Sequence, residues 1–320
     1  FGFTLLTSDI AIGRRTHKSA IGAYEQMRPK WKGLGILTFL VPVLIMTYYA
    51  VIGGWITKYA VVYVSGQASA AAADDYFTSF ITSPVSPVVF ALLFMGVTAL
   101  IVYNGVQNGI EKVSRWMMPV LLVLVVVIAC YSLTLSHTNA DGQVVTGWQG
   151  FLYYLTPNLE GLTVQRFLQI LLDAMSQLFF SLSVSMGIMI TYGSYVHPEV
   201  DLNRAVNQIE IFDTGVAFLA GMMIIPAVYV FSGTEDMGAG PSLMFISLPK
   251  VFAAMGRAGT AVGILFFVTA IFATLSSCIS VLESITANCM EIFRTGRKKT
   301  VLVLTVIYLA ASAVIALGYS

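Results

Sequence analysis

The stretch Gln177-Leu-Phe-Phe-Ser-Leu-Ser-Val-Ser-Met-Gly187 interrupts a long apolar run with three alternating serines and a glycine. Hydroxyls inside a membrane helix often bond back to the carbonyl four residues earlier, which bends the helix only mildly. The alternative is a broken helix, whose freed backbone groups must line a cavity because lipid cannot satisfy them. A half-helix N-terminus then attracts an anion and free carbonyls attract a cation. The residues themselves leave both interpretations open, and the second predicts a binding site near the middle of a membrane.

The composition around this stretch is typical of a membrane protein. Of the 320 residues, 57% are hydrophobic and 10% are charged, whereas a soluble domain carries about 25% charged residues. The mean hydropathy is +0.83. A net charge of +1 provides no basic field for nucleic acid, and the sequence contains no phosphate-binding loop and no dinucleotide fingerprint. We therefore expect a membrane protein with no nucleic-acid partner, no organic cofactor and no enzymatic activity.

Long apolar runs predict one all-α transmembrane domain over residues 1–320, because a span needs about 20 apolar residues. The runs are continuous and lack the alternation of a membrane β-barrel, so strands are not expected. Both ends of the chain lie in apolar runs, and we expect the chain to be an interior piece of a longer protein. The predicted spans are 1–12, 35–64, 86–104, 116–135, 167–195, 203–232, 261–293 and 300–319.

The basic residues predict the orientation of these spans. Thirteen of the 17 Lys and Arg residues fall in alternate loops, at about 13–34, 105–115, 196–202 and 294–299. Because cytoplasmic loops carry an excess of Lys and Arg, we expect these four loops to be cytoplasmic and the protein to be a multi-pass protein of the plasma membrane. On the other side, residues 235–257 predict an extracellular, lid-like loop.

A second polar stretch, Ala273-Thr-Leu-Ser-Ser-Cys278, lies about halfway along the run 261–293. Hydroxyl and carbonyl oxygens are hard ligands that suit a small hard cation, although small polar residues also allow close packing between membrane helices. Tyr49 lies near the middle of the run 35–64, where a phenol must find a polar partner. A structural role and a binding role are both compatible with these residues.

Acidic residues inside a membrane are costly and therefore mark functional sites by default. Asp213 lies about ten residues into the run 203–232, which places it near the membrane centre. Glu283 lies in the cytoplasmic half of its run and Glu291 at the cytoplasmic end. The alternative for each is a structural carboxyl that is protonated, bonded to its helix or solvated.

Taken together, these residues resemble the bacterial branch of the neurotransmitter:sodium symporter family. The match runs through the whole chain in the right order and covers family helices 2 to the start of 9. The matching segments are Asp9-Ile-Ala-Ile-Gly-Arg-Arg15, Gly109-Ile-Glu-Lys-Val-Ser-Arg-Trp-Met-Met-Pro119, Gln177-Leu-Phe-Phe-Ser-Leu-Ser183, Ile190-Thr-Tyr-Gly-Ser-Tyr195, Ser247-Leu-Pro249 and Leu275-Ser-Ser-Cys-Ile-Ser-Val-Leu-Glu283.

The resemblance implies a leucine-transporter-like inverted-repeat helical bundle, incomplete in this chain, with a broken central helix. It also implies sodium-coupled symport of an amino acid by alternating access. One sodium would bind Ser181 and Asp213, and a second would bind Ala273, Ser276 and Ser277. Tyr195 and Glu291 match an inner gate that closes on an N-terminal arginine. The implied substrate pocket comprises Ile45, Tyr49, Phe180, Ser181, Ser183, Met186, Ser277 and Val281.

The sequence departs from the family pattern in ways that bear on function. Family helix 1, which supplies oxygens for both ions, and helix 10, which carries half of the outer gate, lie outside the chain, so we do not expect the chain by itself to transport. Ser185 and Met186 stand where a glycine and a bulky residue are common. Asp213 stands where many members have Asn, and its fixed negative charge beside sodium predicts transport that needs no chloride.

Two other functions remain open at this point. A proton-coupled amino-acid permease of the same architecture would use Asp213 to carry the proton, and a non-transporting sensor would bind substrate without accumulating it. The apolar lining implied by Ile45, Phe180, Met186 and Val281 suggests a hydrophobic or aromatic substrate. The expected partners are thus an amino acid, sodium and membrane lipid. The sequence carries no indication of the oligomeric state.

Overall fold

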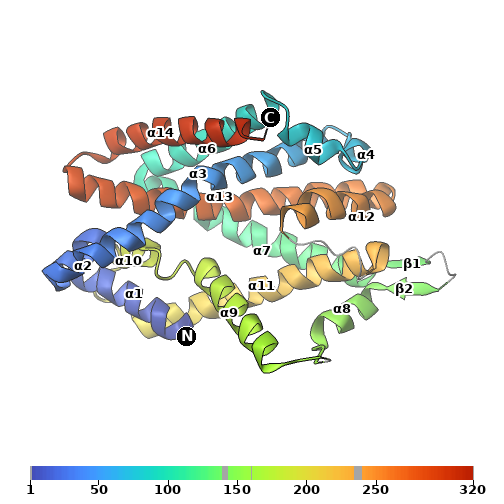
Figure 1. The fold of residues 1–320 in the computed structure, drawn as a ribbon, viewed down its shortest axis with the longest axis horizontal. Coiled ribbons are helices and arrows are strands. Elements are labelled where there is room, and N and C mark those ends of the chain that lie inside the picture. The colour runs from blue at the N-terminus through green and yellow to red at the C-terminus, as the bar shows by residue number, and fades with distance from the viewer. Residues whose placement is uncertain (1, 139–142, 160, 234–239, 320) are drawn as a thin grey trace.

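A bundle of long helices runs along the longest dimension of the molecule in the computed structural model (Figure 1), which describes residues 2–138, 143–159, 161–233 and 240–319. The helices in chain order are α1 (Gly2–Thr16), α2 (Ala20–Met27), η1 (Pro29–Trp31), α3 (Lys32–Val64), α4 (Ala68–Ala71), α5 (Tyr76–Ile81), α6 (Ser86–Tyr103), η2 (Val106–Glu111), α7 (Lys112–Leu133), α8 (Gly147–Leu155), α9 (Val164–Ser181), α10 (Ile188–Gly193), α11 (Leu202–Ser232), η3 (Leu243–Ser247), α12 (Leu248–Ala254), α13 (Arg257–Phe293) and α14 (Arg297–Leu317).

Among the described residues, six helices are long and apolar enough to cross a membrane. They contain α3, α6, α7, α11, α13 and α14 and overlap six of the eight predicted spans. The largest difference is at Val106–Leu133, which begins ten residues before the predicted span 116–135. Residues 2–12 of the predicted span 1–12 lie within α1, which has 15 residues, and residue 1 lies outside the described residues. The predicted span 167–195 is not a continuous helix. The loop predicted at 105–115 is largely helical, because the π-helical turn η2 leads directly into α7.

The central helix is broken between Ser181, where α9 ends, and Ile188, where α10 begins. Ser183, Ser185 and Gly187 have positive φ values of 53°, 60° and 73°, and residues other than glycine seldom adopt this left-handed conformation. The Ser185 N–H donates to Asp9 Oδ2 at 2.8 Å, so a buried carboxylate from α1 compensates one of the freed backbone groups. These observations confirm the prediction of a broken helix. The alternative interpretation, in which the serines only bend the helix mildly, is wrong.

The expectation that the chain contains no strands is wrong. Outside the bundle, β1 (Ser136–Thr138) and β2 (Val144–Thr146) pair in an antiparallel hairpin, with Ser136 opposite Thr146. The following helix α8 begins with a capping box, in which Thr146 and Gln149 satisfy each other's backbone N–H groups. Short strands of this kind satisfy their backbone by pairing, which is possible because they lie beyond the apolar helices.

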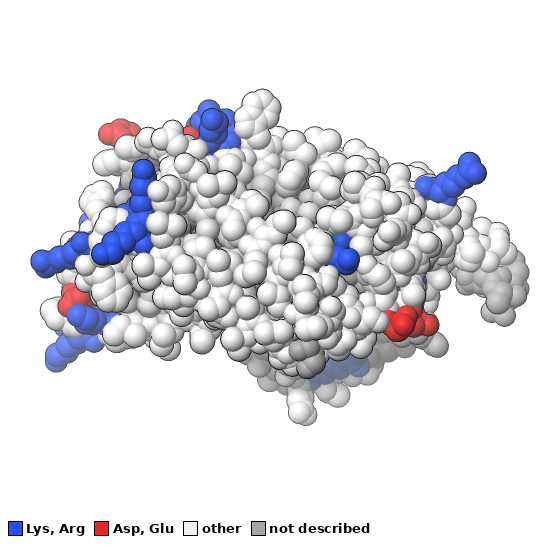
Figure 2. Space-filling view, turned by 90° about the horizontal axis from the view of Figure 1, so that it is seen from above, with Lys and Arg blue, Asp and Glu red and all other residues white. Residues whose placement is uncertain are grey.

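The two ends of the bundle differ in charge. Figure 2 looks onto the face formed partly by α14 and shows Lys and Arg side chains gathered at the left, the end where α2 lies in Figure 1. The connection from α13 to α14 lies at this same end, which we call the basic end. Most of the face between the two ends is uncharged, as expected for helices that lie against lipid.

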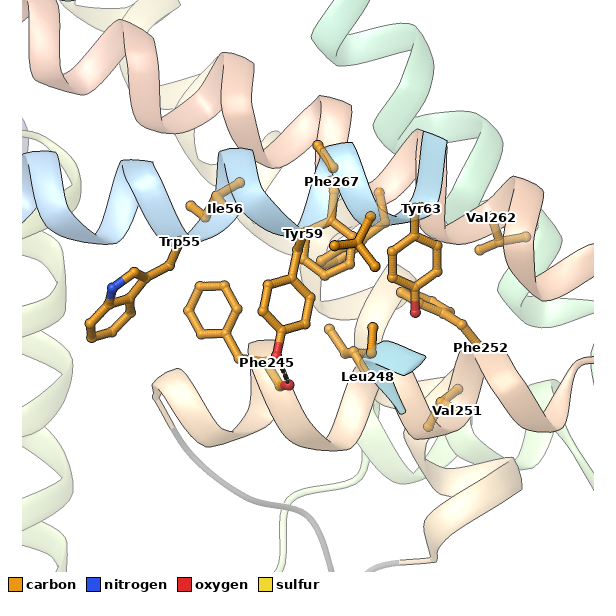
Figure 3. Packing of buried hydrophobic residues seen from close by; sticks show 14 of the residues in the cluster. Trp55, Ile56, Tyr59, Tyr63, Phe245, Leu248, Val251, Phe252, Val262 and Phe267 are labelled. Carbon is orange, nitrogen blue, oxygen red and sulfur yellow. Dashed lines mark hydrogen bonds between the residues drawn. The ribbon is translucent and has the colours of Figure 1, made fainter. Parts of the chain in front are cut away.

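At the opposite end, an aromatic cluster holds the lid-like segment against the bundle (Figure 3). Residues 235–239 of the predicted lid lie outside the described residues, and its described part forms η3 and α12. The Tyr59 hydroxyl of α3 donates to the Phe245 carbonyl at 2.9 Å, and Phe77 stacks on Phe245 with centroids 5.1 Å apart. Lys250 of α12 forms an ion pair with Asp74, which lowers the pKa of the Asp74 carboxyl. The segment is therefore held by aromatic packing and by two polar contacts, one to η3 and one to α12.

Helices α1 and α10 meet through backbone contacts that only glycine permits. A Cβ atom added at Gly13 would meet the carbonyl oxygen of Ile190, and one added at Gly193 would meet the carbonyl oxygen of Ile10. We therefore expect Gly13→Ala to push the two helices apart and to lower the free energy of unfolding by about 2 kcal/mol.

Denaturant unfolding of the complete protein in mild detergent measures this change. Gly33→Ala in α3 is the matched control, because a Cβ at Gly33 meets nothing within 4 Å, and we expect its stability to be unchanged or slightly higher. Equal stability of the two alanine variants would contradict the close contact between α1 and α10.

Candidate functional site

A hollow of about 470 Å³ lies beside the break in the central helix and is bordered by α3, α7, α9, α11 and α13. We call it the central hollow. All eleven residues that the sequence analysis assigned to substrate or sodium line it, although they come from four separate segments of the chain. They are Ile45, Tyr49, Phe180, Ser181, Ser183, Met186, Asp213, Ala273, Ser276, Ser277 and Val281.

On one side of the central hollow, a hydroxyl and a carboxylate meet at the end of α9. Ser181 is the last residue of α9, and its Oγ donates to Asp213 Oδ1 of α11 at 2.7 Å. A hydroxyl oxygen and a carboxylate oxygen at this distance are suitable ligands for a hard monovalent cation.

On the other side, three oxygen atoms cluster on one turn of α13. The Ala273 carbonyl accepts hydrogen bonds from Ser276 Oγ at 2.8 Å and from Ser277 Oγ at 3.3 Å. Ser277 Oγ also interacts with the phenol of Tyr49 from α3. The turn therefore presents one carbonyl and two hydroxyl oxygens to the central hollow, and a phenol lies beside them.

Apolar side chains complete the lining, and several of them were not expected from the sequence. Met118 and Leu121 of α7, Ile188 of α10, and Phe212 and Val216 of α11 all line the central hollow. An apolar residue on a membrane helix looks the same in the sequence whether it faces lipid or a cavity, so no pattern distinguished these. Gln177, quoted in the polar stretch without a role, also lies in the lining.

The two predicted gate residues lie outside the lining of the central hollow and contact different partners. The Tyr195 hydroxyl donates to Glu283 Oε1 at 2.7 Å. Glu291 Oε1 instead accepts from the N–H and the hydroxyl of Ser19, at 2.7 and 2.5 Å, just before α2. The structure thus joins Glu291 to Ser19, the residue that precedes α2, and does not join it to Tyr195.

Glu283 is the fully buried acid of this region, and its role was not resolved from the sequence. It has 0% exposure and accepts two hydrogen bonds from Arg297 of α14, at 2.5 and 2.8 Å. Two further hydroxyl contacts join α10 to α13, from Tyr192 to Ser280 at 3.0 Å and between Thr191 and Ser284 at 3.3 Å. The short helix α10 is therefore bound to α13 by polar side chains.

Comparison with known proteins places this arrangement in a family. The family model described as "Sodium:neurotransmitter symporter family" matches residues 1–79 and 84–319. The chain belongs to the sodium:neurotransmitter symporter family. Its match to the family confirms the resemblance seen in the sequence and makes the chain part of a multi-pass membrane protein of a sodium-dependent transporter family.

Individual relatives agree with this assignment. An uncharacterized sodium-dependent transporter of Bacillus subtilis is 35% identical over 93% of this chain and 64% of its own length. Another, of Haemophilus influenzae, is 31% identical over 99% of this chain and 69% of its own length. The crystal structure of MhsT in complex with L-phenylalanine matches with a TM-score of 0.85 and 34% identity, covering 100% of this chain and 70% of that one. The chain thus spans about two thirds of the length of these relatives and has the expected fold.

Proposed function

We propose that the complete protein couples the entry of sodium to the symport of an amino acid across the plasma membrane by alternating access. The observation that carries this proposal is the Ser181–Asp213 contact at the break, which shares one hollow with the oxygen cluster of Ala273, Ser276 and Ser277. Membership of a sodium-dependent family favours sodium over a proton as the coupling ion.

Each group lining the central hollow has a role in this proposal. Ser181 and Asp213 hold one sodium, and Ala273, Ser276 and Ser277 hold the second. Hydroxyl and carbonyl oxygens provide no charge of their own at the second site, so its affinity depends on oxygens from elsewhere as well. The broken segment, including Ser183, offers free backbone groups to the amino and carboxyl groups of the substrate.

The substrate is best matched by a hydrophobic or aromatic amino acid. The Tyr49 phenol donates to the substrate carboxylate, and the side chain of the substrate contacts Ile45, Phe180, Met186 and Val281. The only polar side chain among these five is that of Tyr49, so a charged substrate side chain would lose its hydration without compensation. The L-phenylalanine in the MhsT complex is an amino acid of this class.

Coupling follows from the electrostatics of the central hollow. Sodium and the substrate carboxylate neutralise each other there, whereas either charge alone would pay a desolvation cost of several kcal/mol. Each ligand therefore raises the affinity for the other, and thermodynamic linkage makes this effect reciprocal. On the cytoplasmic side, Tyr195 and Glu291 belong to the inner gate, and the basic loops at about 13–34, 105–115, 196–202 and 294–299 face the cytoplasm.

Uptake of labelled phenylalanine and leucine into proteoliposomes containing the complete protein tests the function. We expect accumulation with an inward sodium gradient and none with a proton gradient alone. Accumulation that follows pH and ignores sodium would instead show a proton-coupled permease. Binding without accumulation under any gradient would show a sensor.

Transport should not depend on chloride. Asp213 already supplies a negative charge beside the first sodium, so an additional anion would be repelled rather than required. We expect the initial rate of sodium-driven uptake to stay the same when chloride is replaced by gluconate on both sides of the vesicle. A rate that falls severalfold in gluconate would contradict the proposed position of Asp213 at the sodium ion.

A further inference from the structure

Helix α14 is flanked by two apolar grooves in its first half. The groove between α13 and α14 has a volume of about 350 Å³, and Cys289, Phe293, Val303, Leu304 and Ile307 provide its apolar lining. The groove between α6 and α14 has a volume of about 360 Å³ and is lined mainly by Gly96, Ala99, Leu100, Tyr103, Val301 and Leu302.

The two grooves lie on either side of one exposed ridge. Leu302 lines one groove and Val303 the other, and successive helical residues differ by about 100° around the axis. Val306, one turn further along, projects between them and is 66% exposed. Two apolar chains that follow the grooves would therefore lie on opposite sides of Val306.

Each groove ends at a lysine in the first turn of α14. Lys299 lines the α13–α14 groove. The Lys298 ammonium lies 5.5 Å from the centroid of the Tyr103 ring, and Tyr103 lines the α6–α14 groove. Both lysines are exposed, whereas Arg297, their neighbour, is engaged by Glu283. The connection 294–299 contains four basic residues and no acidic residue, so the mouths of both grooves carry positive charge.

We propose that α14 carries a specific site for one anionic phospholipid with two acyl chains. The chains occupy the two grooves, and the phosphate lies between Lys298 and Lys299 at the basic end. Basic residues beside grooves between membrane helices favour anionic headgroups, and each such residue strengthens binding severalfold. The site rests on the family's placement of these helices in a membrane and on both grooves staying open to lipid in the complete protein. It is independent of the sodium and substrate sites, so a failure of either proposal leaves the other intact.

Native mass spectrometry of the complete protein from micelles with equal phosphatidylglycerol and phosphatidylcholine tests the site. We expect one retained phosphatidylglycerol, favoured roughly tenfold over phosphatidylcholine. Lys298→Gln/Lys299→Gln should abolish this preference, and Lys30→Gln/Lys112→Gln, which removes two exposed lysines that line neither groove, should keep it. Inorganic phosphate should not displace the lipid, since it cannot occupy the grooves.

A second variant tests the grooves without changing charge. A Cβ added at Gly96 meets nothing within 4 Å, so Gly96→Leu fills the α6–α14 groove without disturbing the packing of the protein. We expect retention of phosphatidylglycerol to fall severalfold while the protein unfolds at an unchanged or higher denaturant concentration.

Three results would overturn the site. The first is equal retention of the two lipids by the parent protein. The second is an equal loss in both lysine pairs, which would show a general effect of surface charge. The third is unchanged retention in Gly96→Leu. Efficient disulfide cross-linking of Val306→Cys to a second copy, with no lipid retained, would show that another protein chain covers the ridge instead.

Discussion

Asp213→Ala is expected to weaken sodium-dependent substrate binding by roughly 100-fold or more. Among the residues that the structure describes, Asp213 is the only acidic one that lines the central hollow. Opposite unit charges about 4 Å apart interact by about 4 kcal/mol at the effective dielectric typical of protein sites, and alanine removes this attraction. A sodium titration of labelled amino-acid binding to the complete protein measures the change.

Two further variants separate charge from structure in this experiment. Asp213→Asn keeps an oxygen ligand and a hydrogen-bond partner for Ser181 but loses the charge, so we expect an intermediate loss. Asp173→Ala removes an exposed carboxylate of α9 that is outside the lining, and we expect binding to stay unchanged. If sodium affinity in Asp213→Ala matches that of the parent, the first sodium site does not include Asp213.

The second large effect concerns stability at the basic end. Arg297→Ala is expected to lower the free energy of unfolding by about 3–5 kcal/mol, because it leaves the fully buried Glu283 carboxylate without its cation. Denaturant unfolding in mild detergent provides the measurement. The double variant Glu283→Gln/Arg297→Gln removes both charges together, and we expect it to recover much of this loss.

An exposed ion pair gives the matched control. Arg115 and Glu111 pair at 2.8 Å on the surface of the helical segment that contains α7, with side chains 74% and 56% exposed. We expect Arg115→Ala to change the stability by less than about 0.5 kcal/mol. If Arg115→Ala and Arg297→Ala destabilise the protein equally, burial does not set the strength of the Glu283–Arg297 pair.

The local sequence indicated the break in the central helix as one of two possibilities, and the family resemblance favoured it over a mild bend. Alternating serines and a glycine compete with helical hydrogen bonding within a few residues. Gly187 adopts its positive φ without strain, whereas the positive φ of Ser183 and Ser185 is unusual for residues other than glycine and could not be predicted. The bond from Ser185 to Asp9 was not predictable, because the two residues lie 176 positions apart. Spacing along the chain says nothing about which distant carboxylate compensates a freed amide.

Other features were missed for identifiable reasons. Arg297 was counted among the basic loop residues, and only the turn between α13 and α14 shows that it points back to Glu283. The hairpin of β1 and β2 was missed because the prediction rested on long apolar runs, and these two three-residue strands lie in a connection between such runs.

The short helix α10 packs against α1 through one kind of seam, or contact surface, and against α13 through another. This difference determines how α10 can move. Toward α1, the glycines allow the two backbones to pack directly against each other. Separating the helices there would lose these packing contacts, and water would form few hydrogen bonds in the gap. Toward α13, the bonds are hydroxyl to hydroxyl and hydroxyl to carboxylate, which water can replace one for one. An entrance at the basic end would therefore open along this polar seam, and α10 would move together with α1 as one rigid unit.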